Sequence, residues 1–150
     1  MPNQAVINLE ENPPRLVSNI KYTEATIGDL HANIIKLIHI LVHVGIIELD
    51  HKTYKDLVQI YKNPSLTLSD LIDFQNILDK HIIVLNTNIT IRLLGDCLFD
   101  RGRNDILFLK FLKFLTFHHV SYRIIFSNHD AEFLRLMINH PKSCPTELTQ

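Results

Sequence analysis

The chain has 150 residues, which is the size of one ordinary domain and long enough to bury a core. Its 15 Lys and Arg residues against 16 Asp and Glu residues give a formal net charge of −1, so no general positive field exists to attract nucleic acid or an anionic membrane. We therefore expect neither nucleic acid nor a membrane as a partner, and any bound anion must be held by local groups.

The cysteines and the first residues bear on the compartment. Cys97 and Cys144 lie far apart and lack metal-ligand spacing, so a reducing compartment is favoured over a disulfide framework. The start, Met-Pro-Asn-Gln, lacks the cationic and apolar regions of a signal peptide. We expect a soluble protein without a signal peptide.

The first predicted unit along the chain is an arm. Residues 1–16 contain three prolines and an acidic pair but no periodicity, which predicts a flexible N-terminal arm. Residues 17–150 form the predicted domain. Its first element is a short strand that ends at Gly28.

A helix is predicted over about residues 32–44 and is ended by Gly45. Its apolar residues form one wide face, whereas Lys36, His39 and His43 share the opposite stripe, which we expect to face solvent. These side chains also interrupt the longest apolar stretch, so this stretch is not a membrane span.

The middle of the chain predicts two more helices. One covers residues 52–62, and another starts at Thr67, where the spacing of Thr67 and Asp70 is the signature of a capping box. Together they form a predicted helical insertion at about 52–80.

Strands and helices alternate after the insertion. The β-branched runs 81–85 and 89–94 flank a polar turn, which is compatible with a hairpin or with a helix-to-strand approach. A largely buried helix is predicted over 105–117, a strand over 120–127 and a helix over 131–140. A strand thus runs into a polar turn and then a helix three times, which is typical of an α/β sheet with helices packed on it.

Each of the three strand-to-helix turns carries a dense polar cluster. The clusters are Gly28-Asp29-Leu30-His31, then Gly95-Asp96 with Asp100-Arg101-Gly102, and then Asn128-His129-Asp130. Because the carboxyl ends of strands in α/β sheets face one crevice, where ligands bind, we expect the three clusters to meet there.

The residue types in these clusters suit a phosphate ester and divalent metals. Asp, His and Asn side chains are metal ligands, and one carboxylate can bridge two ions. Arg meets phosphate oxygens with two parallel hydrogen bonds. His129 next to Asn128 could protonate a leaving alcohol if a carboxylate such as that of Asp100 orients its ring.

At this point the sequence resembles a known family. GDLHAN (28–33), GDCLFDRG (95–102) and SNHDAE (127–132), in this order, resemble the three motifs of calcineurin-like metallophosphoesterases. The Asp-Arg-Gly element resembles the phosphoprotein phosphatase branch, which contains Ser/Thr phosphatases and bacterial effector phosphatases. The resemblance implies an α/β fold that is the N-terminal half of a metallophosphoesterase-type β-sandwich flanked by helices.

The resemblance also implies a role for each matched position. Four metal ligands are implied, of which the third would bridge both ions: Asp29, His31, Asp96 and Asn128. Three residues would act on the substrate as general acid, its orienting partner and the phosphate-binding group, in this order: His129, Asp100 and Arg101. The cofactor would be two divalent ions, with Mn expected and Fe or Zn as alternatives. The attacking group in the family is a metal-bridging hydroxide, so no covalent phosphoenzyme is implied.

The sequence departs from the family pattern at three places. Ala32 and Ser127 stand where the family has Gly, which is tolerable if neither position needs a positive φ. Three residues separate Asp96 from Asp100, one more than in the common form, so the bridging role of Asp96 is better supported than the roles of Asp100 and Arg101. The family also has two further His ligands and a second Arg near the C-terminus, whereas His140 is the last histidine here.

The missing ligands favour an N-terminal fragment of a longer phosphatase over a half-domain that another chain completes. The leading hypothesis is a metal-dependent phosphomonoesterase that acts on phosphorylated Ser, Thr or Tyr of a protein substrate, in the cytoplasm or as a secreted effector in a host cytosol. The alternatives are a dinucleoside polyphosphate hydrolase and a non-catalytic, phosphatase-like module that binds a partner through an exposed sheet edge.

Overall fold

A three-stranded parallel sheet forms one layer of the described structure. The computed structural model describes residues 8–15, 23–98, 105–128, 130–131 and 135. Three strands, β1 (Glu24–Gly28), β4 (Thr90–Leu94) and β5 (Tyr122–Ile125), pair in parallel in the order β1-β4-β5. Gly28 pairs with Leu94, and Leu94 pairs with Ile125, so the three carboxyl ends lie level at one edge of the sheet.

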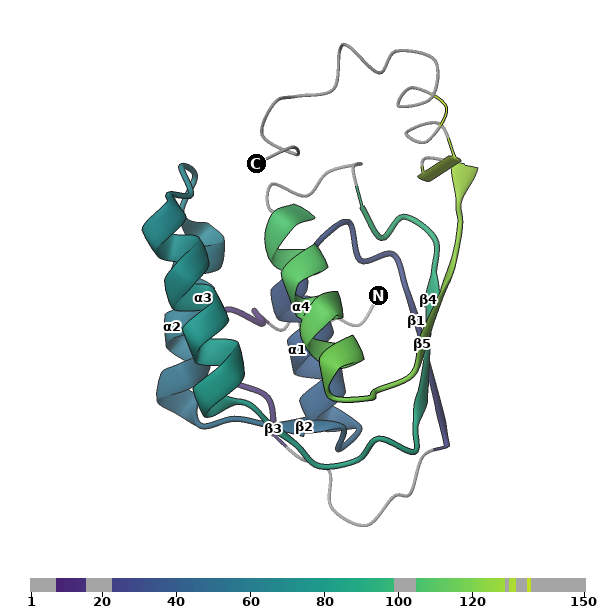
Figure 1. Cartoon of the computed structure of the whole chain (residues 1–150), viewed down its shortest axis with the longest axis horizontal. Coiled ribbons are helices and arrows are strands. Elements are labelled where there is room, and N and C mark those ends of the chain that lie inside the picture. The colour runs from purple at the N-terminus through teal and green to yellow at the C-terminus, as the bar shows by residue number, and fades with distance from the viewer. Residues whose placement is uncertain (1–7, 16–22, 99–104, 129, 132–134, 136–150) are drawn as a thin grey trace, which may run out of the picture.

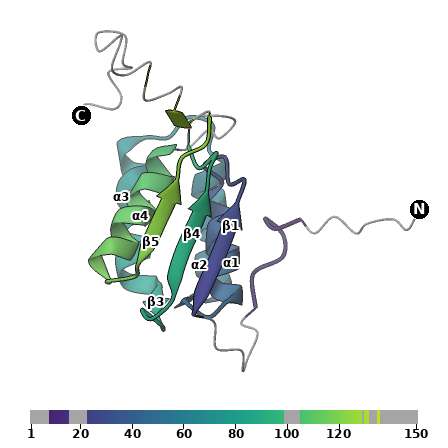
Figure 2. The ribbon, with the colours of Figure 1, turned by 90° about the vertical axis from the view of Figure 1, so that its right-hand side faces the viewer.

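Four helices lie on one side of this sheet. They are α1 (Ile34–His43), α2 (His51–Lys62), α3 (Leu68–His81) and α4 (Asp105–Phe117). In Figure 1, α1 and α4 stand next to the sheet and α2 and α3 lie beyond them. Figure 2 shows the other face of the sheet, over which no described helix passes. The described elements are therefore layered in the order sheet, α1 and α4, then α2 and α3.

The strand sequences explain this one-sided packing. Ala25 and Ile27 of β1, together with Ile91 and Leu93 of β4, are buried, whereas the residues that alternate with them are exposed or half-buried. Since successive side chains of a strand point to opposite faces, the helices cover the apolar face. The α/β class is as predicted, and so is the meeting of the carboxyl ends of the strands at one edge. Among the described residues no second sheet packs on the open face, so the sandwich stays a prediction.

A separate, two-stranded sheet corrects one interpretation of the sequence. β2 (Ile47–Glu48) pairs with β3 (Ile83–Val84) in an antiparallel ribbon. The runs 81–85 and 89–94 therefore do not form a hairpin with each other, because the first run pairs with β2 and the second forms β4. β2 was not predicted, since a two-residue strand carries no periodicity.

The predicted solvent stripe of α1 is also wrong in part. His43 is exposed, but Lys36 and His39 are half-buried. The ring of His39 packs against the ring of Tyr54 on α2, with 6.5 Å between the ring centres. Burial lowers the pKa of His39 below its ordinary value, and the nearby His43 lowers it further.

Part of the predicted arm contacts α2. The Tyr54 hydroxyl donates a hydrogen bond to the Leu9 carbonyl (2.7 Å), and Lys62 forms an ion pair with Glu10 (2.5 Å). Burial, with a smaller effect of Glu10, raises the pKa of Tyr54 to about 12. The flexibility predicted for residues 1–16 and the domain limits remain predictions.

Candidate metal centre

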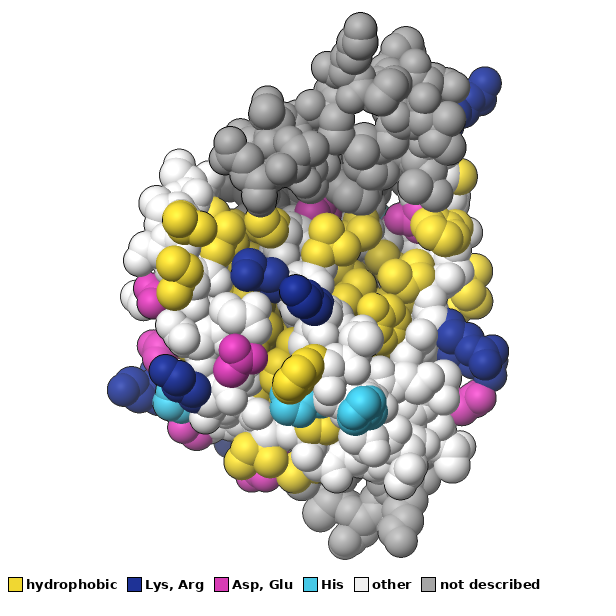
Figure 3. Space-filling view, in the orientation of Figure 1, with side chains coloured by type: hydrophobic (Ala, Val, Ile, Leu, Met, Phe, Trp, Pro, Cys, Tyr) yellow, Lys and Arg dark blue, Asp and Glu magenta, His cyan; other side chains and the backbone are white. Residues whose placement is uncertain are grey.

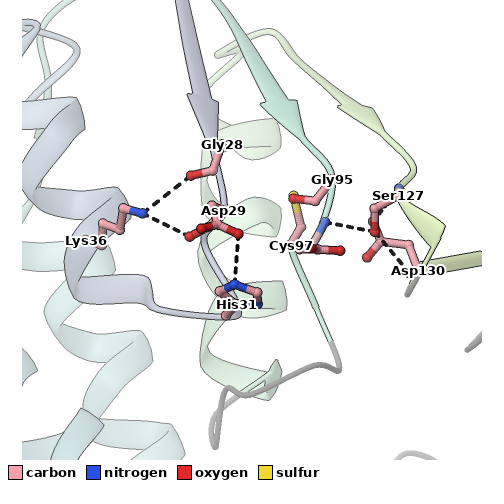
Figure 4. A network of polar contacts seen from close by, with 9 residues as sticks. Gly28, Asp29, His31, Lys36, Gly95, Cys97, Ser127 and Asp130 are labelled. Carbon is pink, nitrogen blue, oxygen red and sulfur yellow. Dashed lines mark hydrogen bonds and ion pairs between the residues drawn. The ribbon is translucent and has the colours of Figure 1, made fainter.

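The candidate site lies where β1 and β4 end. Asp29 and His31 lie in the turn between β1 and α1 (Figure 4), and Asp96 lies in the turn that follows β4. One ligand atom from each of these three residues lies within 4.8 Å of the others. The structure therefore brings together three of the four metal ligands that the sequence suggested.

Backbone hydrogen bonds hold the two turns against each other. The His31 amide donates to the Asp96 carbonyl (2.7 Å), and the Ala32 amide donates to the Cys97 carbonyl (2.8 Å). The β1–α1 turn is closed by the Asn33 amide, which donates to the Leu30 carbonyl (2.8 Å). The ligand side chains thus sit on two loops that share one backbone network.

Both turns use left-handed backbone, which side-chain-bearing residues rarely adopt. Asp29 (φ 59°), His31 (47°) and Ala32 (56°) lie on the first turn, and Gly95 (58°) and Asp96 (45°) lie on the second. Each such non-glycine residue costs of the order of 1–2 kcal/mol. Strained backbone of this kind clusters at functional sites, where the surrounding structure imposes it.

The carboxylate of Asp96 is the feature that most needs a cation. Its Oδ1 atom is buried and has no hydrogen-bond partner among the described residues. A buried carboxylate oxygen without a partner costs several kcal/mol, and metal coordination removes that cost. His31 Nε2 lies 2.9 Å from Asp29 Oδ1, with the His31 side chain mostly buried and the Asp29 carboxylate exposed. Two carboxylates and an imidazole around one space are a donor set that fits a divalent transition metal.

Lys36 supports the first turn from the side. Its ammonium group donates to the carbonyls of Asp29 (2.9 Å) and Gly28 (3.4 Å), as Figure 4 shows. The Asn33 side chain caps the same helix by accepting from the Lys36 amide (2.9 Å). Sequence reasoning missed this role because Lys36 lies on the polar stripe. Its place in the first helical turn after the motif was the available signal, since an N-terminal lysine can reach back to the preceding loop.

The third predicted turn, after β5, is bonded to the second. The Gly95 amide donates to the Ile125 carbonyl (2.7 Å), and the Asp96 amide donates to the Ser127 hydroxyl (3.0 Å). Asn128 comes directly after Ser127 and is exposed, and its role as a ligand stays a prediction. The remaining predicted residues lie outside the described part of the chain: Asp100, Arg101 and His129.

Cys97 lies beside the site but does not have the character of a ligand. It is buried, and burial raises the pKa of its thiol to about 11, with smaller effects from the charges of Asp130 and Asp96. A thiol with this pKa is protonated near neutral pH and is a poor nucleophile. Cys97 therefore acts as a small core residue, as the sequence suggested.

Two comparisons relate this arrangement to known proteins. Residues 90–149 match the family described as WipA-like, phosphatase domain. The crystal structure of the phosphatase domain from the Legionella effector WipB is similar, with a TM-score of 0.63 and 31% sequence identity over 84% of this chain. Both comparisons indicate a phosphatase domain. No curated protein matches the chain.

The similarity extends over part of the WipB domain. The aligned region covers 48% of the WipB chain, so this chain spans about half the length of that relative. The match supports the predicted likeness to bacterial effector phosphatases. None of the helices in the described part of the chain combines the length and apolar character that a membrane span requires.

Proposed function

We propose that the chain contributes part of the active site of a metal-dependent phosphomonoesterase that acts on phosphorylated Ser, Thr or Tyr side chains of a protein. The buried, unpartnered Oδ1 atom of Asp96, within reach of Asp29 and His31, is the observation that carries this proposal. The likeness to the WipA-type and WipB phosphatase domains supports it.

The metal ligands proposed from this chain are Asp29, His31, Asp96 and Asn128. Bound divalent cations, with Mn proposed ahead of Fe or Zn, would supply Lewis acidity and lower the pKa of water at the site. In the calcineurin-like metallophosphoesterase pattern, the residue at the position of Asp96 would bind both cations. The place of Asp96 fits this role, because its backbone bonds to His31 in the first turn and to Ser127 in the third.

Three further residues are proposed to act on the substrate. The Arg101 guanidinium would bind two phosphoryl oxygens, since its planar fork matches their geometry. His129 would donate a proton to the leaving oxygen of the Ser, Thr or Tyr side chain, and the Asp100 carboxylate would orient the His129 ring. Replacing Arg101 would then weaken substrate binding, whereas replacing His129 would slow the chemical step.

We further propose that residues outside this sequence complete the site. Leu94 and Ile125 pair on the outer face of the sheet near the site, and Phe126 comes next, with exposed fractions between 43% and 63%. Figure 3 shows hydrophobic side chains on the surface over α4 and along the margin where the sheet lies. A cluster of exposed apolar side chains marks a surface that another structure covers. A second half of a phosphatase domain would cover it and supply the remaining ligands.

Metal binding by this chain is the first test. In isothermal titration calorimetry with Mn²⁺, we expect the wild type to bind and Asp96→Asn to lose affinity by roughly 10- to 100-fold or more, because the amide removes the negative charge. Asp79→Asn is the matched control, since Asp79 is exposed on α3 and bonds only to Gln75 among the described residues. Equal Mn²⁺ affinity of Asp96→Asn and wild type would contradict the metal site.

Substrate assays then separate the enzyme hypotheses. A longer chain that contains the second half should hydrolyse p-nitrophenyl phosphate and a phosphopeptide in a way that depends on Asp96. Preference for a dinucleoside polyphosphate would favour the nucleotide alternative. The second candidate is the non-catalytic module, which the exposed apolar face favours. Tight binding of a partner without metal-dependent hydrolysis would support it.

A further inference from the structure

The Ser127 hydroxyl lies at the junction of the second and third turns. It accepts a hydrogen bond from the Asp96 amide (3.0 Å) and one from the Asp130 amide (3.3 Å), and it donates to Asp130 Oδ2 (3.0 Å). One donated and two accepted bonds use the full capacity of a hydroxyl group. The orientation of Ser127 is therefore fixed from both sides.

The bond to Asp96 holds the part of the backbone that directs its carboxylate. Asp96 has a left-handed φ of 45°, and Gly95 before it has a φ of 58°. A Cβ atom added at Gly95 would lie only 2.7 Å from Ser127 Cβ, so the two turns are in close contact. The φ angle is the rotation about the bond between the amide nitrogen and Cα. With the Asp96 amide held by Ser127 and φ held at 45°, the direction of the Cα–Cβ bond is set, which limits where the carboxylate points.

Asp130 in turn holds Ser127. The Asp130 side chain is 5% exposed, and its Oδ2 atom also accepts from the Ser127 amide (2.9 Å). This is the reciprocal pattern of a capping box, in which a hydroxyl and a carboxylate three residues later bond to each other's amides. Figure 4 shows Asp130, Ser127 and the second turn as one connected group.

We propose that Ser127, held by Asp130, is a positioning residue that sets the direction of the Asp96 carboxylate at the metal site. This inference rests on the proposed function, because it assigns a purpose to a contact with a proposed ligand. Replacement of the family glycine by Ser127 then adds a side-chain link between the β5 turn and the central ligand, which a glycine lacks.

A second capping box in the same chain provides a matched control. On α3 the Asp70 amide donates to the Thr67 hydroxyl (3.2 Å), and the Thr67 amide donates to Asp70 Oδ2 (2.7 Å). This box has the same chemistry as the one formed by Ser127 and Asp130, but it caps a helix away from the site. Removal of either hydroxyl should destabilise the protein, whereas only removal of the Ser127 hydroxyl should affect Asp96.

The test compares Ser127→Ala with Thr67→Ala by three measurements: urea unfolding, amide hydrogen exchange at Asp96 in the metal-free protein, and Mn²⁺ affinity from the electron paramagnetic resonance signal of free Mn²⁺. We expect both variants to lower the urea midpoint, and Ser127→Ala to lower it more, because its hydroxyl also bonds to Asp96 and Asp130 is buried. Only Ser127→Ala should speed exchange at Asp96 and weaken Mn²⁺ binding, roughly tenfold. Ser127→Thr, which keeps the hydroxyl, should restore both values.

Two results would overturn the inference. One is an Asp96 exchange rate and an Mn²⁺ affinity that are the same in Ser127→Ala and Thr67→Ala. The other is a Ser127→Thr variant that behaves like Ser127→Ala. If Ser127→Ala does not fold, Ser127→Gly and Thr67→Gly take the place of the alanine pair, because Gly at an N-cap costs little. Failure of the wild type to bind Mn²⁺ would refute the proposed function, and exchange at Asp96 would still decide whether Ser127 holds it.

Discussion

Ala32 shows how one methyl group limits the geometry of the first turn. The sequence indicated that Ala could replace the family glycine if no positive φ were needed, but Ala32 has a φ of 56° and is fully buried. The condition therefore fails. The hydrogen bond from the Ala32 amide to the Cys97 carbonyl holds this left-handed conformation, which lowers the free energy of unfolding.

Substitutions at Ala32 should reveal this cost. Ala32→Val should destabilise the protein more than Ala25→Val by about 1 kcal/mol or more, because a β-branched side chain tolerates left-handed backbone even less than alanine does, whereas it suits a strand. Ala25 is a suitable control because it is also buried but lies in β1. Ala32→Gly should be close to neutral, because relief of that strain is offset by about 0.8 kcal/mol for the lost methyl group and about 0.4–1 kcal/mol of chain entropy.

Urea unfolding of the three variants would measure these differences. Equal destabilisation by Ala32→Val and Ala25→Val would show that the turn carries no left-handed strain. A large loss of stability in Ala32→Gly would show instead that the methyl group packs better than its area suggests.

At the scale of elements, two helices end in the same motif with different residues. After α1, the Gly45 amide donates to the Val42 carbonyl (3.0 Å) and the next amide donates to Leu41 (2.9 Å). After α4, the His119 amide donates to the Thr116 carbonyl (3.0 Å) and the next amide donates to Leu115 (2.9 Å). Both patterns are Schellman motifs, which place a left-handed residue just past the helix.

The left-handed residue is a glycine after α1 but a histidine after α4, with φ values of 74° at Gly45 and 60° at His119. We expect His119→Gly to stabilise the protein by about 1 kcal/mol and Gly45→His to destabilise it by about 1–2 kcal/mol. For a chain of this size the first change corresponds to a rise of roughly 2–4 °C in Tm. Thermal unfolding followed by circular dichroism measures both, and a fall in Tm for His119→Gly would mean that the imidazole makes a contact that outweighs the strain.

The sequence allowed some elements to be predicted better than others for physical reasons. The stop of α1 at Gly45 and the Thr67–Asp70 box were predictable because each uses a residue type with a strong local preference. The end of α4 was predicted near residue 117, but its left-handed residue was not, because histidine gives no such signal. β2 was not predicted, and the pairing partner of the run that contains β3 was left open, because two-residue strands are specified by pairing rather than by periodicity.

At the scale of the molecule, the meeting of the polar turns was predictable from topology alone. Parallel strands with crossover helices place every strand-to-helix turn at the same edge, so Asp29, His31 and Asp96 had to lie near one another. The links from Lys36 and Ser127 were not predictable, because they depend on side-chain directions across separate elements. The contact of the N-terminal segment with α1 and α2 was missed for the same reason.

Burial of the His39 ring, which packs against Tyr54, makes stability depend on pH. Burial lowers the pKa of His39 from 6.5, His43 lowers it further, and a backbone hydrogen bond with Asn12 acts in the opposite direction. The unfolded chain therefore takes up a proton at His39 at a higher pH than the folded chain does. The contribution to the free energy of unfolding is present above pH 6.5 and is lost as the pH falls below it.

His39→Gln should flatten this dependence. We expect the urea midpoint of the wild type to fall between about pH 7.5 and about pH 5.5, and the fall to be smaller in His39→Gln because glutamine does not titrate. His43→Gln should reduce the fall less, since burial is the larger cause of the pKa shift. Hydrogen bonds within their caps lower the pKa values of the Asp50 and Asp70 carboxyl groups. These groups therefore change protonation at a more acidic pH and do not contribute to the fall of the urea midpoint in this range. An equal fall in wild type and His39→Gln would show that protonation of His39 does not cause the loss of stability at lower pH.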